Sequence, residues 1–266
     1  MVMQTKWTAD RIKHLKGGEK ITCLTAYDYT TAKFVDASGI QLVLVGDSLA
    51  NTMLGHTTTL SVTMEQMLHH TSAVARGVTS ALVVADMPFM SYQVSTEQAL
   101  ENAGRFLKEA GADAVKIEGG AFRTSTISAL VANGIPVLGH IGLTPQSIRQ
   151  SGYKVQGRQT SDAERLVLDA RALEEAGVFG IVIECVPAQL GAIITRTVGV
   201  PTIGIGAGPD CDGQILVSHD LLGLSGSTAP KFIKCYADLG DRMVKAFKEY
   251  KTEVESGAFP TDKQCY

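Results

Sequence analysis

Short runs of consecutive apolar residues alternate along the chain with longer, helix-like segments. A strand that is covered on both faces is apolar at successive positions, so these runs predict buried strands of a parallel sheet. The predicted strands are Ile21–Ala26, Leu42–Asp47, Ala81–Asp86, Ala114–Glu118, Pro136–His140, Gly180–Glu184 and Pro201–Gly206, with a less regular eighth around Ile215–Leu224. Strands and helices that alternate over a whole chain indicate right-handed crossovers between parallel strands.

The segments between the strands carry signals for the starts and ends of helices. The capping-box pattern occurs three times, as Thr63 with Gln66, Ser95 with Gln98, and Ser161 with Glu164. Because such a pair satisfies backbone N–H groups at a helix start, we expect helices to begin there. Two of these helices are expected to end at a glycine, at Gly111 and Gly177.

A weak internal repeat indicates how many strand–helix units there are. Residues 110–118 resemble residues 176–184: in both, a helix ends at glycine, a strand begins, and a glutamate closes the strand. These glutamates are Glu118 and Glu184. About eight such units close into a (β/α)8 TIM barrel, which is the predicted α/β fold.

An open, doubly wound sheet is the competing architecture. That fold usually has a GxGxxG loop after its first strand, whereas here Tyr27, Asp28 and Tyr29 follow. Polar residues also close at least five different predicted strands, as the active face of a barrel requires. A single barrel domain over residues 1–266 is therefore expected.

The composition excludes several classes of protein. Apolar residues make up 45% and charged residues 19% of the chain, which is ordinary for a globular protein. A net charge of −3 without a basic stripe argues against a nucleic-acid partner. The five cysteines are odd in number and form no CxxC pair, so neither a disulfide framework nor a zinc site is expected.

Targeting and membrane signals are also missing from the sequence. Residues 1–20 contain no continuous apolar run, which argues against a signal peptide. No stretch approaches the roughly 20 apolar residues that a membrane span needs. We therefore expect a soluble, cytoplasmic protein with no membrane contact.

Five predicted strands end in an ionisable residue: Asp47, Asp86, Glu118, His140 and Glu184. In a parallel barrel these ends lie on one rim, and catalytic groups come from several strands there. For a single aspartate, capping of the following helix is an equally good explanation. Five such residues in one chain favour a functional site.

Three of these residues, Asp47, Asp86 and Glu118, are candidate metal ligands. Clustered carboxylates repel one another unless a cation lies between them. Carboxylates are hard oxygen ligands and no cluster of thiolates or histidines accompanies them, so Mg²⁺ is favoured over Zn²⁺. Magnesium usually keeps open positions, which leaves room for a bidentate 2-keto acid. A buried hydrogen-bond network without metal is the alternative.

Three further residues are candidates for chemistry. Lys116 precedes Glu118 by two positions, so both side chains face the barrel mouth, where Lys116 either pairs with Glu118 or binds a substrate carboxylate. The apolar surroundings of Glu184 in Ile-Val-Ile-Glu-Cys-Val-Pro should raise its proton affinity, as a general base requires. Pairing with an arginine is the alternative for Glu184. His140 either orients a ligand or completes the hydrogen bonding at the rim.

Two polar stretches punctuated by glycine, Asn51–Ser61 and Ser147–Arg158, follow rim strands. They are candidate lids that exclude water from the site, with ordinary surface loops as the alternative.

The strand-end segments together resemble the ketopantoate hydroxymethyltransferase family, from about Ile21 to about Pro260. The segments that carry the resemblance are Val45–Leu49, Ala85–Phe89, Val115–Gly120, Gly139–Gln146, Gly152–Arg158, Ile183–Pro187, Ile203–Gly208 and Asp212–Gln214. One departure lies beside Ser48, where Ala50 and Asn51 replace the usual glycine continuation.

The resemblance implies a barrel of the phosphoenolpyruvate/pyruvate type and a specific reaction. A hydroxymethyl group passes from the co-substrate 5,10-methylenetetrahydrofolate to 3-methyl-2-oxobutanoate, giving 2-dehydropantoate for pantothenate biosynthesis, through a Mg²⁺-stabilised enolate. The implied roles are as follows: Asp47, Asp86 and Glu118 bind Mg²⁺; Asp47, Ser48, Asp86, Lys116 and His140 contact the substrate; Glu184 accepts the C3 proton. Family members commonly form homodecamers, so a homo-oligomer is expected.

Two other functions remain open at this point. A metal-dependent carbon–carbon lyase acting on a small 2-keto or 2-hydroxy acid would share the metal site and differ in its lids. A lyase of the isocitrate lyase type should carry a reactive cysteine on a mobile loop, and neither candidate lid contains cysteine. A barrel kept as a binding module would need neither the carboxylates nor Glu184.

Overall fold

The computed structural model describes residues 5–225 and 230–266. It divides into two compact units, Met1–Val217 and Ser218–Tyr266, and each is described by itself. Every strand of the fold that the structure describes lies in the first unit.

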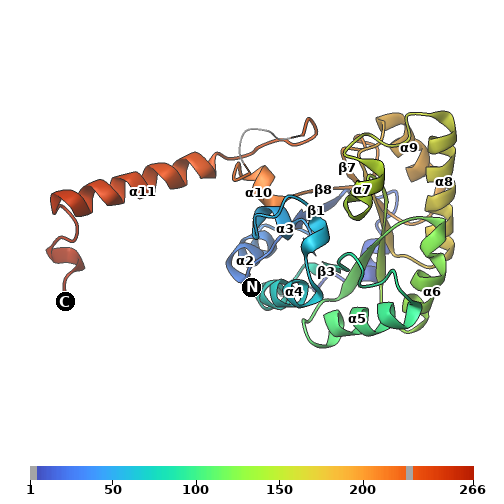
Figure 1. The fold of residues 1–266 in the computed structure, drawn as a ribbon, viewed down its shortest axis with the longest axis horizontal. Coiled ribbons are helices and arrows are strands. Elements are labelled where there is room, and N and C mark those ends of the chain that lie inside the picture. The colour runs from blue at the N-terminus through green and yellow to red at the C-terminus, as the bar shows by residue number, and fades with distance from the viewer. Residues whose placement is uncertain (1–4, 226–229) are drawn as a thin grey trace. The chain divides into compact units, whose positions relative to one another are not determined.

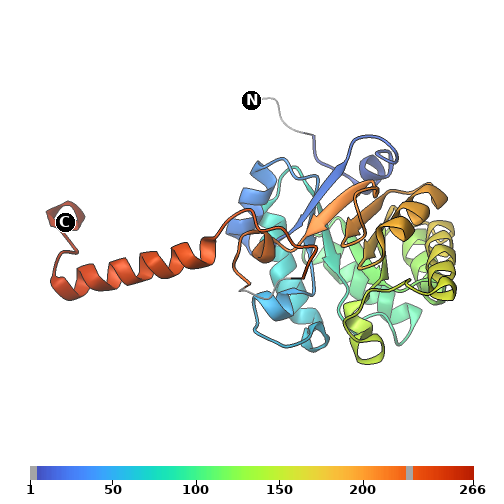
Figure 2. The same ribbon diagram turned by 90° about the horizontal axis from the view of Figure 1, so that it is seen from above.

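The described residues of the first unit form a closed barrel of eight parallel strands (Figure 1). The strands are β1 Ile21–Thr25, β2 Leu42–Val45, β3 Leu82–Asp86, β4 Ala114–Glu118, β5 Val137–Gly142, β6 Gly180–Glu184, β7 Thr202–Ile205 and β8 Gly213–Leu216. Each pairs with the next in sequence, and β8 closes the barrel by pairing in parallel with β1. The two closing strands, blue and orange, lie side by side in Figure 2. The predicted (β/α)8 barrel is confirmed.

Helices follow the strands around the outside of the barrel (Figure 1). In the first unit they are α1 Ala9–Lys13, α2 Tyr29–Ala37, α3 Leu49–Thr52, α4 Met64–Gly77, α5 Thr96–Lys108, α6 Thr124–Ala132, α7 Ile148–Ser151, α8 Thr160–Glu175 and α9 Ala188–Thr197, with 3-10 turns η1 Thr59–Ser61, η2 Ala121–Arg123 and η3 Pro145–Ser147. The second unit contains α10 Ser218–Leu221, α11 Leu239–Ser256 and the 3-10 turn η4 Asp262–Gln264. No helix in the described parts of the chain has both the length and the apolar character to cross a bilayer.

Most predicted strands agree with the structure to within two residues, and the eighth does not. The strand β8 begins at Gly213, before the predicted start at Ile215, and residues Ser218–Leu221 are helical. Gly213 pairs with Ile21 of β1, and a Cβ at this position would lie 2.4 Å from the Ile21 carbonyl oxygen. The closing strand therefore begins at a glycine, and the apolar pattern gave no signal there.

The predicted helix starts are confirmed at two of three places. Thr63 and Gln66 form the full capping box at α4, and the Ser95 side chain accepts a hydrogen bond from Gln98 N at α5. The prediction at Ser161 was wrong. Helix α8 begins earlier, at Thr160, with Gln159 in the capping position and no side-chain cap.

Side chains that point into the barrel change from apolar to charged along β3 and β4. Leu82 and Val84 lie in the apolar interior, and Asp86, two residues farther along the same strand, ends it. On β4, apolar Ala114 is followed by Lys116 and Glu118 at the same two-residue spacing. Since alternate residues of a strand share a face, the barrel's apolar floor positions a charged layer directly above it.

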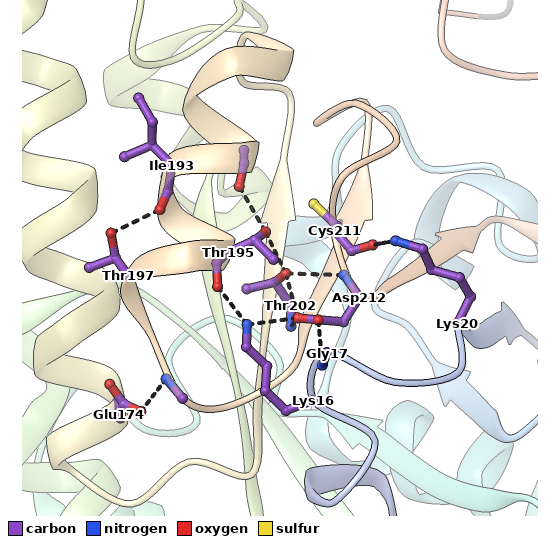
Figure 3. Close-up of polar contacts among 12 residues, drawn as sticks. Lys16, Gly17, Lys20, Glu174, Ile193, Thr195, Thr197, Thr202, Cys211 and Asp212 are labelled. Atoms are coloured by element: carbon purple, nitrogen blue, oxygen red, sulfur yellow. Dashed lines mark hydrogen bonds and ion pairs between the residues drawn. The ribbon is translucent and has the colours of Figure 1, made fainter.

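The opposite end of the barrel is closed by a network around Asp212 (Figure 3). Its carboxylate accepts hydrogen bonds from Lys16 Nζ at 2.9 Å, from Gly17 N at 3.0 Å and from Thr202 N at 2.8 Å. Burial by itself raises the pKa of Asp212, but the bonds from Lys16 and the two amides lower it below its usual range. Lys16 also donates to the Thr195 carbonyl oxygen. This carboxylate ties the N-terminal segment to the β7–β8 junction.

Replacing Asp212 by asparagine should lower the free energy of unfolding by about 3 kcal/mol at neutral pH, because one side of a buried ion pair is lost. Because the pKa of Asp212 is lowered in the folded state, its carboxylate stabilises the fold at pH values above about 4, the usual pKa of an aspartate. That stabilisation is lost as the pH falls. The gap between variant and wild type should therefore shrink below about pH 4. Urea denaturation of Asp212→Asn, with exposed Asp210→Asn as control, measures both. Equal stability of the two variants would contradict this.

Candidate active site

All seven residues singled out from the sequence line one small cavity at the carboxyl ends of the strands. They are Asp47, Ser48, Asp86, Lys116, Glu118, His140 and Glu184, around a cavity of about 120 Å³. Five of these side chains are at most 5% exposed. The rest of the wall includes apolar residues, namely Leu44, Val182, Ile205, Ile215, Leu216 and Val217. The cavity therefore has a charged side and an apolar side.

Asp86 connects the first charged groups of the cavity. Its Oδ2 accepts a hydrogen bond from Asp47 N at 2.9 Å, and its Oδ1 lies 3.1 Å from Lys116 Nζ. Parallel pairing of β3 and β4 sets Asp86 directly beside Lys116. Neither aspartate caps the following helix, because α3 and α5 have Ser48 and Ser95 at their N-caps. The capping explanation for these aspartates was wrong.

His140 joins Lys116 to the two glutamates. Its Nδ1 lies 3.0 Å from Lys116 Nζ and 3.6 Å from Glu118 Oε1, and its Nε2 lies 3.1 Å from Glu184 Oε2. A lysine ammonium only donates, so Nδ1 of a neutral ring accepts and the proton sits on Nε2. A protonated ring also carries Nε2–H. In either protonation state, the proton on His140 Nε2 faces Glu184. The charged partner of Glu184 in the structure is therefore His140 and not an arginine.

Opposing effects set the pKa of His140. Burial and the Lys116 ammonium lower the pKa, and contacts with Glu118 and Glu184 raise it above its usual value. The histidine is therefore part of the charge balance of the cavity rather than an isolated rim residue.

Ser48 is held at the cavity by Tyr27. The two hydroxyl oxygens are 2.8 Å apart, and Tyr27 is fully buried. A Cβ at Gly46 would lie 2.8 Å from Ser48 Oγ, so the approach of this turn to the site requires glycine. Of the two unusual residues that follow, Ala50 is buried in the core, and Asn51 Nδ2 donates to the His56 carbonyl oxygen.

The positive charge near the buried carboxylates is too small to neutralise all of them. Burial raises the pKa of Asp47 to about 8, with the neighbouring carboxylates of Asp86 and Glu118 adding to the rise. Burial also raises the pKa of Asp86, against the opposing charge of Lys116. For Lys116, burial would lower the pKa, but the surrounding carboxylates outweigh it and hold the pKa above its usual value. The cluster therefore favours an added proton or cation.

The carboxylates can accommodate a metal ion but do not form a preformed cage. Among residues 5–225 and 230–266, no group of three or more His, Cys, Asp or Glu side chains has the geometry of a metal site. Glu118 Oε1 is nevertheless buried without a hydrogen bond, and Asp86 Oδ1 has the Lys116 ammonium as its partner, 3.1 Å away. Buried acceptors without a donor are costly, and a hard cation would satisfy them.

Gln146 is a site residue that the sequence reasoning missed. It is buried, its Nε2 donates to Asp47 Oδ2 at 3.0 Å, and its backbone N donates to Glu118 Oε2 at 3.0 Å. Tyr92 OH donates to its Oε1 at 2.7 Å. Gln146 follows Pro145 in a turn rather than at a strand end, so a search of strand ends could not find it. Its place in the Gly139–Gln146 motif was the available signal.

A second, larger cavity of about 370 Å³ lies on the other side of β4 and β5. Its walls are Gly119, Gly120, Phe122, Ile141, Gly142, Thr144, Ser147, Gln150, Gln156, Arg165, Leu166 and Asp169. Several of them belong to the predicted lid Ser147–Arg158. Leu143 N donates to the Glu184 carbonyl oxygen and Gln156 N to the Cys185 carbonyl oxygen. This lid segment therefore joins the strand end that carries Glu184.

Comparison with known proteins gives a consistent family. Residues 6–262 match the family model described as ketopantoate hydroxymethyltransferase. A 3-methyl-2-oxobutanoate hydroxymethyltransferase of Clostridium novyi is 57% identical over 96% of this chain and 93% of its own length. A protein of the same name from Moorella thermoacetica is 52% identical over the full length of both chains.

Solved structures resemble the fold at much lower identity. A 2,3-dimethylmalate lyase of the PEP mutase/isocitrate lyase superfamily is 16% identical, with a TM-score of 0.61 over 100% of this chain and 93% of that one. A phosphonopyruvate hydrolase in complex with oxalate and Mg²⁺ is also 16% identical, with a TM-score of 0.62 over 97% and 93%. These likenesses support the barrel alone.

Replacing Lys116 by methionine should lower the free energy of unfolding by about 3 kcal/mol at neutral pH, because buried carboxylates lose their counter-charge. In the wild type, Asp47 ionises near pH 8. Without Lys116 the pKa of Asp47 should be higher, so the difference in unfolding free energy between variant and wild type should grow as the pH rises through about 8. Denaturant titrations over this pH range measure the effect. Lys108→Met, on the exposed face of α5, is the control. A pH-independent difference would contradict the charge balance described above.

Proposed function

Because the chain belongs to the ketopantoate hydroxymethyltransferase family, we propose that it transfers a hydroxymethyl group from 5,10-methylenetetrahydrofolate to 3-methyl-2-oxobutanoate, giving 2-dehydropantoate. The observation that carries this proposal is a single small cavity that combines three acidic strand ends, a buried lysine and Glu184 beside an apolar wall. A small branched keto acid matches this cavity, because one of its ends is anionic and the other is aliphatic.

Asp47, Asp86 and Glu118 would hold a Mg²⁺ ion, and the buried Glu118 oxygen that lacks a hydrogen bond supports this choice. When bound, such an ion acts as a Lewis acid toward the keto and carboxylate oxygens of the substrate. The chain's own contribution is to fix the carboxylates in a dry cavity, where their attraction for a cation is strongest.

Lys116 and Ser48 would bind the charged end of the keto acid. The Lys116 ammonium keeps its proton at neutral pH, because the carboxylates around it raise its pKa. Its positive charge stabilises the negative charge that develops on the substrate during the reaction. The Ser48 hydroxyl, held by Tyr27, supplies a neutral hydrogen bond. The apolar wall formed by β6, β7 and β8 suits the isopropyl group.

Glu184 would remove the proton from C3 of the substrate. Its side chain is the most exposed of the carboxylates that contact His140 and Lys116, at 17%, so it faces the open part of the cavity. His140 Nε2 lies 3.1 Å from Glu184 Oε2, a close contact without the geometry of a hydrogen bond. One oxygen of Glu184 thus faces histidine, which leaves the other available to accept a carbon-bound proton.

The folate co-substrate needs a second compartment beside the keto acid, and the 370 Å³ cavity is the candidate. It combines an exposed aromatic ring, Phe122, with polar Thr144, Gln150 and Asp169. A pterin ring has the same mixture of flat aromatic faces and hydrogen-bonding edges. The cavity borders the segment that is hydrogen-bonded to the Glu184 backbone, so a donor bound there would lie near the site of proton removal.

A carbon–carbon lyase on the same barrel is disfavoured by the relatives, which are named hydroxymethyltransferases. The proposal extends to a cytoplasmic homo-oligomer, which family resemblance implies is a homodecamer.

Replacing Glu184 by glutamine should slow exchange of the C3 proton of 3-methyl-2-oxobutanoate for deuterium by about 10²–10⁴-fold, because the general base is lost. Exchange without folate, followed by NMR in D₂O with Mg²⁺, isolates this step. Keto-acid binding should persist, since glutamine has nearly the same shape. Glu175→Gln, at the exposed end of α8, is the control. Exchange at the wild-type rate would exclude Glu184 as the base.

Replacing Phe122 by alanine should raise KM for 5,10-methylenetetrahydrofolate by about 2- to 10-fold, the range expected for one aromatic contact. KM for the keto acid and deuterium exchange at C3 should stay unchanged. Steady-state turnover with both substrates varied gives these values, and this folate-dependent assay also tests the proposed reaction. Phe34→Ala, equally exposed on α2, is the control. Unchanged folate KM would remove the co-substrate from this cavity.

A further inference from the structure

Gln146 connects two of the three carboxylates proposed to bind the ion. Its side-chain Nε2 donates to Asp47 Oδ2 at 3.0 Å, and its backbone N donates to Glu118 Oε2 at 3.0 Å. The residue is 7% exposed. No step of the proposed reaction uses it, so its hydrogen bonds need another explanation.

The orientation of the Gln146 amide is fixed by its neighbours. Nε2 also lies 2.9 Å from the Met87 carbonyl oxygen, which can only accept, so the NH₂ group must face Met87 and Asp47. On the other side, Oε1 accepts from Tyr92 OH at 2.7 Å and from Gln93 Nε2 at 3.2 Å. Both N–H groups and the carbonyl oxygen are used, so the amide is held rigidly and cannot rotate without losing several bonds.

Each of the three carboxylates has one oxygen engaged by a neutral donor. Asp47 Oδ2 accepts from the Gln146 side chain, and Glu118 Oε2 accepts from the Gln146 backbone. Asp86 Oδ2 accepts from Asp47 N. Of the remaining oxygens, Glu118 Oε1 is buried without a hydrogen bond, and Asp86 Oδ1 faces the Lys116 ammonium at 3.1 Å. The neutral donors therefore leave one oxygen of each group to positively charged partners.

We propose that Gln146 is a positioning residue that selects the metal ion by restricting Asp47 to one coordinating oxygen. Mg²⁺ requires a compact octahedral shell at about 2.0–2.1 Å, which single carboxylate oxygens provide. Ca²⁺ is larger, takes about 6–8 oxygens and often binds carboxylates through both. Because Gln146 Nε2 holds Oδ2 of Asp47, the other oxygen is favoured as the single metal ligand. The inference rests on the proposed function, because it assumes the metal site described there.

Side chain and backbone make separable contributions. The bond from Gln146 N to Glu118 remains in any substitution other than proline. Among the three carboxylates, side-chain variants therefore remove a hydrogen bond only from Asp47, along with the bonds to Met87, Tyr92 and Gln93. Methionine has a similar length and volume to glutamine and lacks the amide. Gln146→Met therefore frees Asp47 Oδ2 with little change in packing.

The test is direct metal binding, without turnover. Isothermal titration of metal-free Gln146→Met should show a Kd for Mg²⁺ about 10–100-fold weaker than wild type, the usual effect of losing a contact that orients a ligand. The Kd for Ca²⁺ should change less, so the preference for Mg²⁺ over Ca²⁺ falls. Gln150→Met, an exposed residue of the same segment, should bind both ions as wild type does. A folded Gln146→Met with unchanged preference overturns the proposal.

A second variant covers the case in which Gln146→Met does not fold. Tyr92→Phe keeps Gln146 and removes the hydroxyl that holds Oε1 at 2.7 Å and that also makes longer contacts with the Glu118 backbone. Its Kd for Mg²⁺ should rise by about 2- to 10-fold, mainly from loss of the shortest of these bonds, again with a smaller change for Ca²⁺. Equal weakening of both ions would contradict the role in selection. Wild-type protein that binds no Mg²⁺ would instead overturn the proposed metal site itself, which separates the two failures.

Discussion

The structure depends on the cost of holding Asp47, Asp86 and Glu118 together in a buried cavity with Lys116 as the nearest ammonium. Burial raises the pKa values of both aspartates, and the lysine does not cancel that effect. A protein retains such an arrangement where a cation or a reaction uses it. The barrel makes it possible, because its strands end at one rim above an apolar interior that anchors them.

Buried carboxylates at the two ends of the barrel differ in their hydrogen-bond partners. At the closing end, Asp212 receives an ammonium and two backbone amides, so its charge is satisfied and stabilises the fold. At the rim, three buried carboxylates surround Lys116 and Glu118 Oε1 lacks a hydrogen bond, so negative charge there remains available to a ligand. Both ends use buried carboxylates, and their partners distinguish a structural role from a functional one.

The sequence predicted the barrel and the rim residues because both follow from local patterns. Consecutive apolar residues ending in an acid mark a strand and its active end, and Asp86, Glu118 and Glu184 are those positions. Gln146 and Tyr92 could not be found this way, since both lie in turns. Gln146 reaches the Glu118 carboxylate and Tyr92 the Glu118 backbone, over 28 and 26 residues along the chain. The eighth strand was misplaced because it begins at Gly213 and Gln214, which are not apolar, and the close approach of β1 leaves no room for a side chain at Gly213.

The central claim is that carboxylates from β3, β4 and the turn after β2 share one cation, which binds a 2-oxo acid. Crystals soaked with Mn²⁺, as an anomalous scatterer in place of Mg²⁺, and with 3-methyl-2-oxobutanoate test it most directly. The account predicts one anomalous peak at coordination distance, about 2.1 Å, from one oxygen each of Asp47, Asp86 and Glu118. A peak elsewhere, or one that leaves out any of the three, would contradict it.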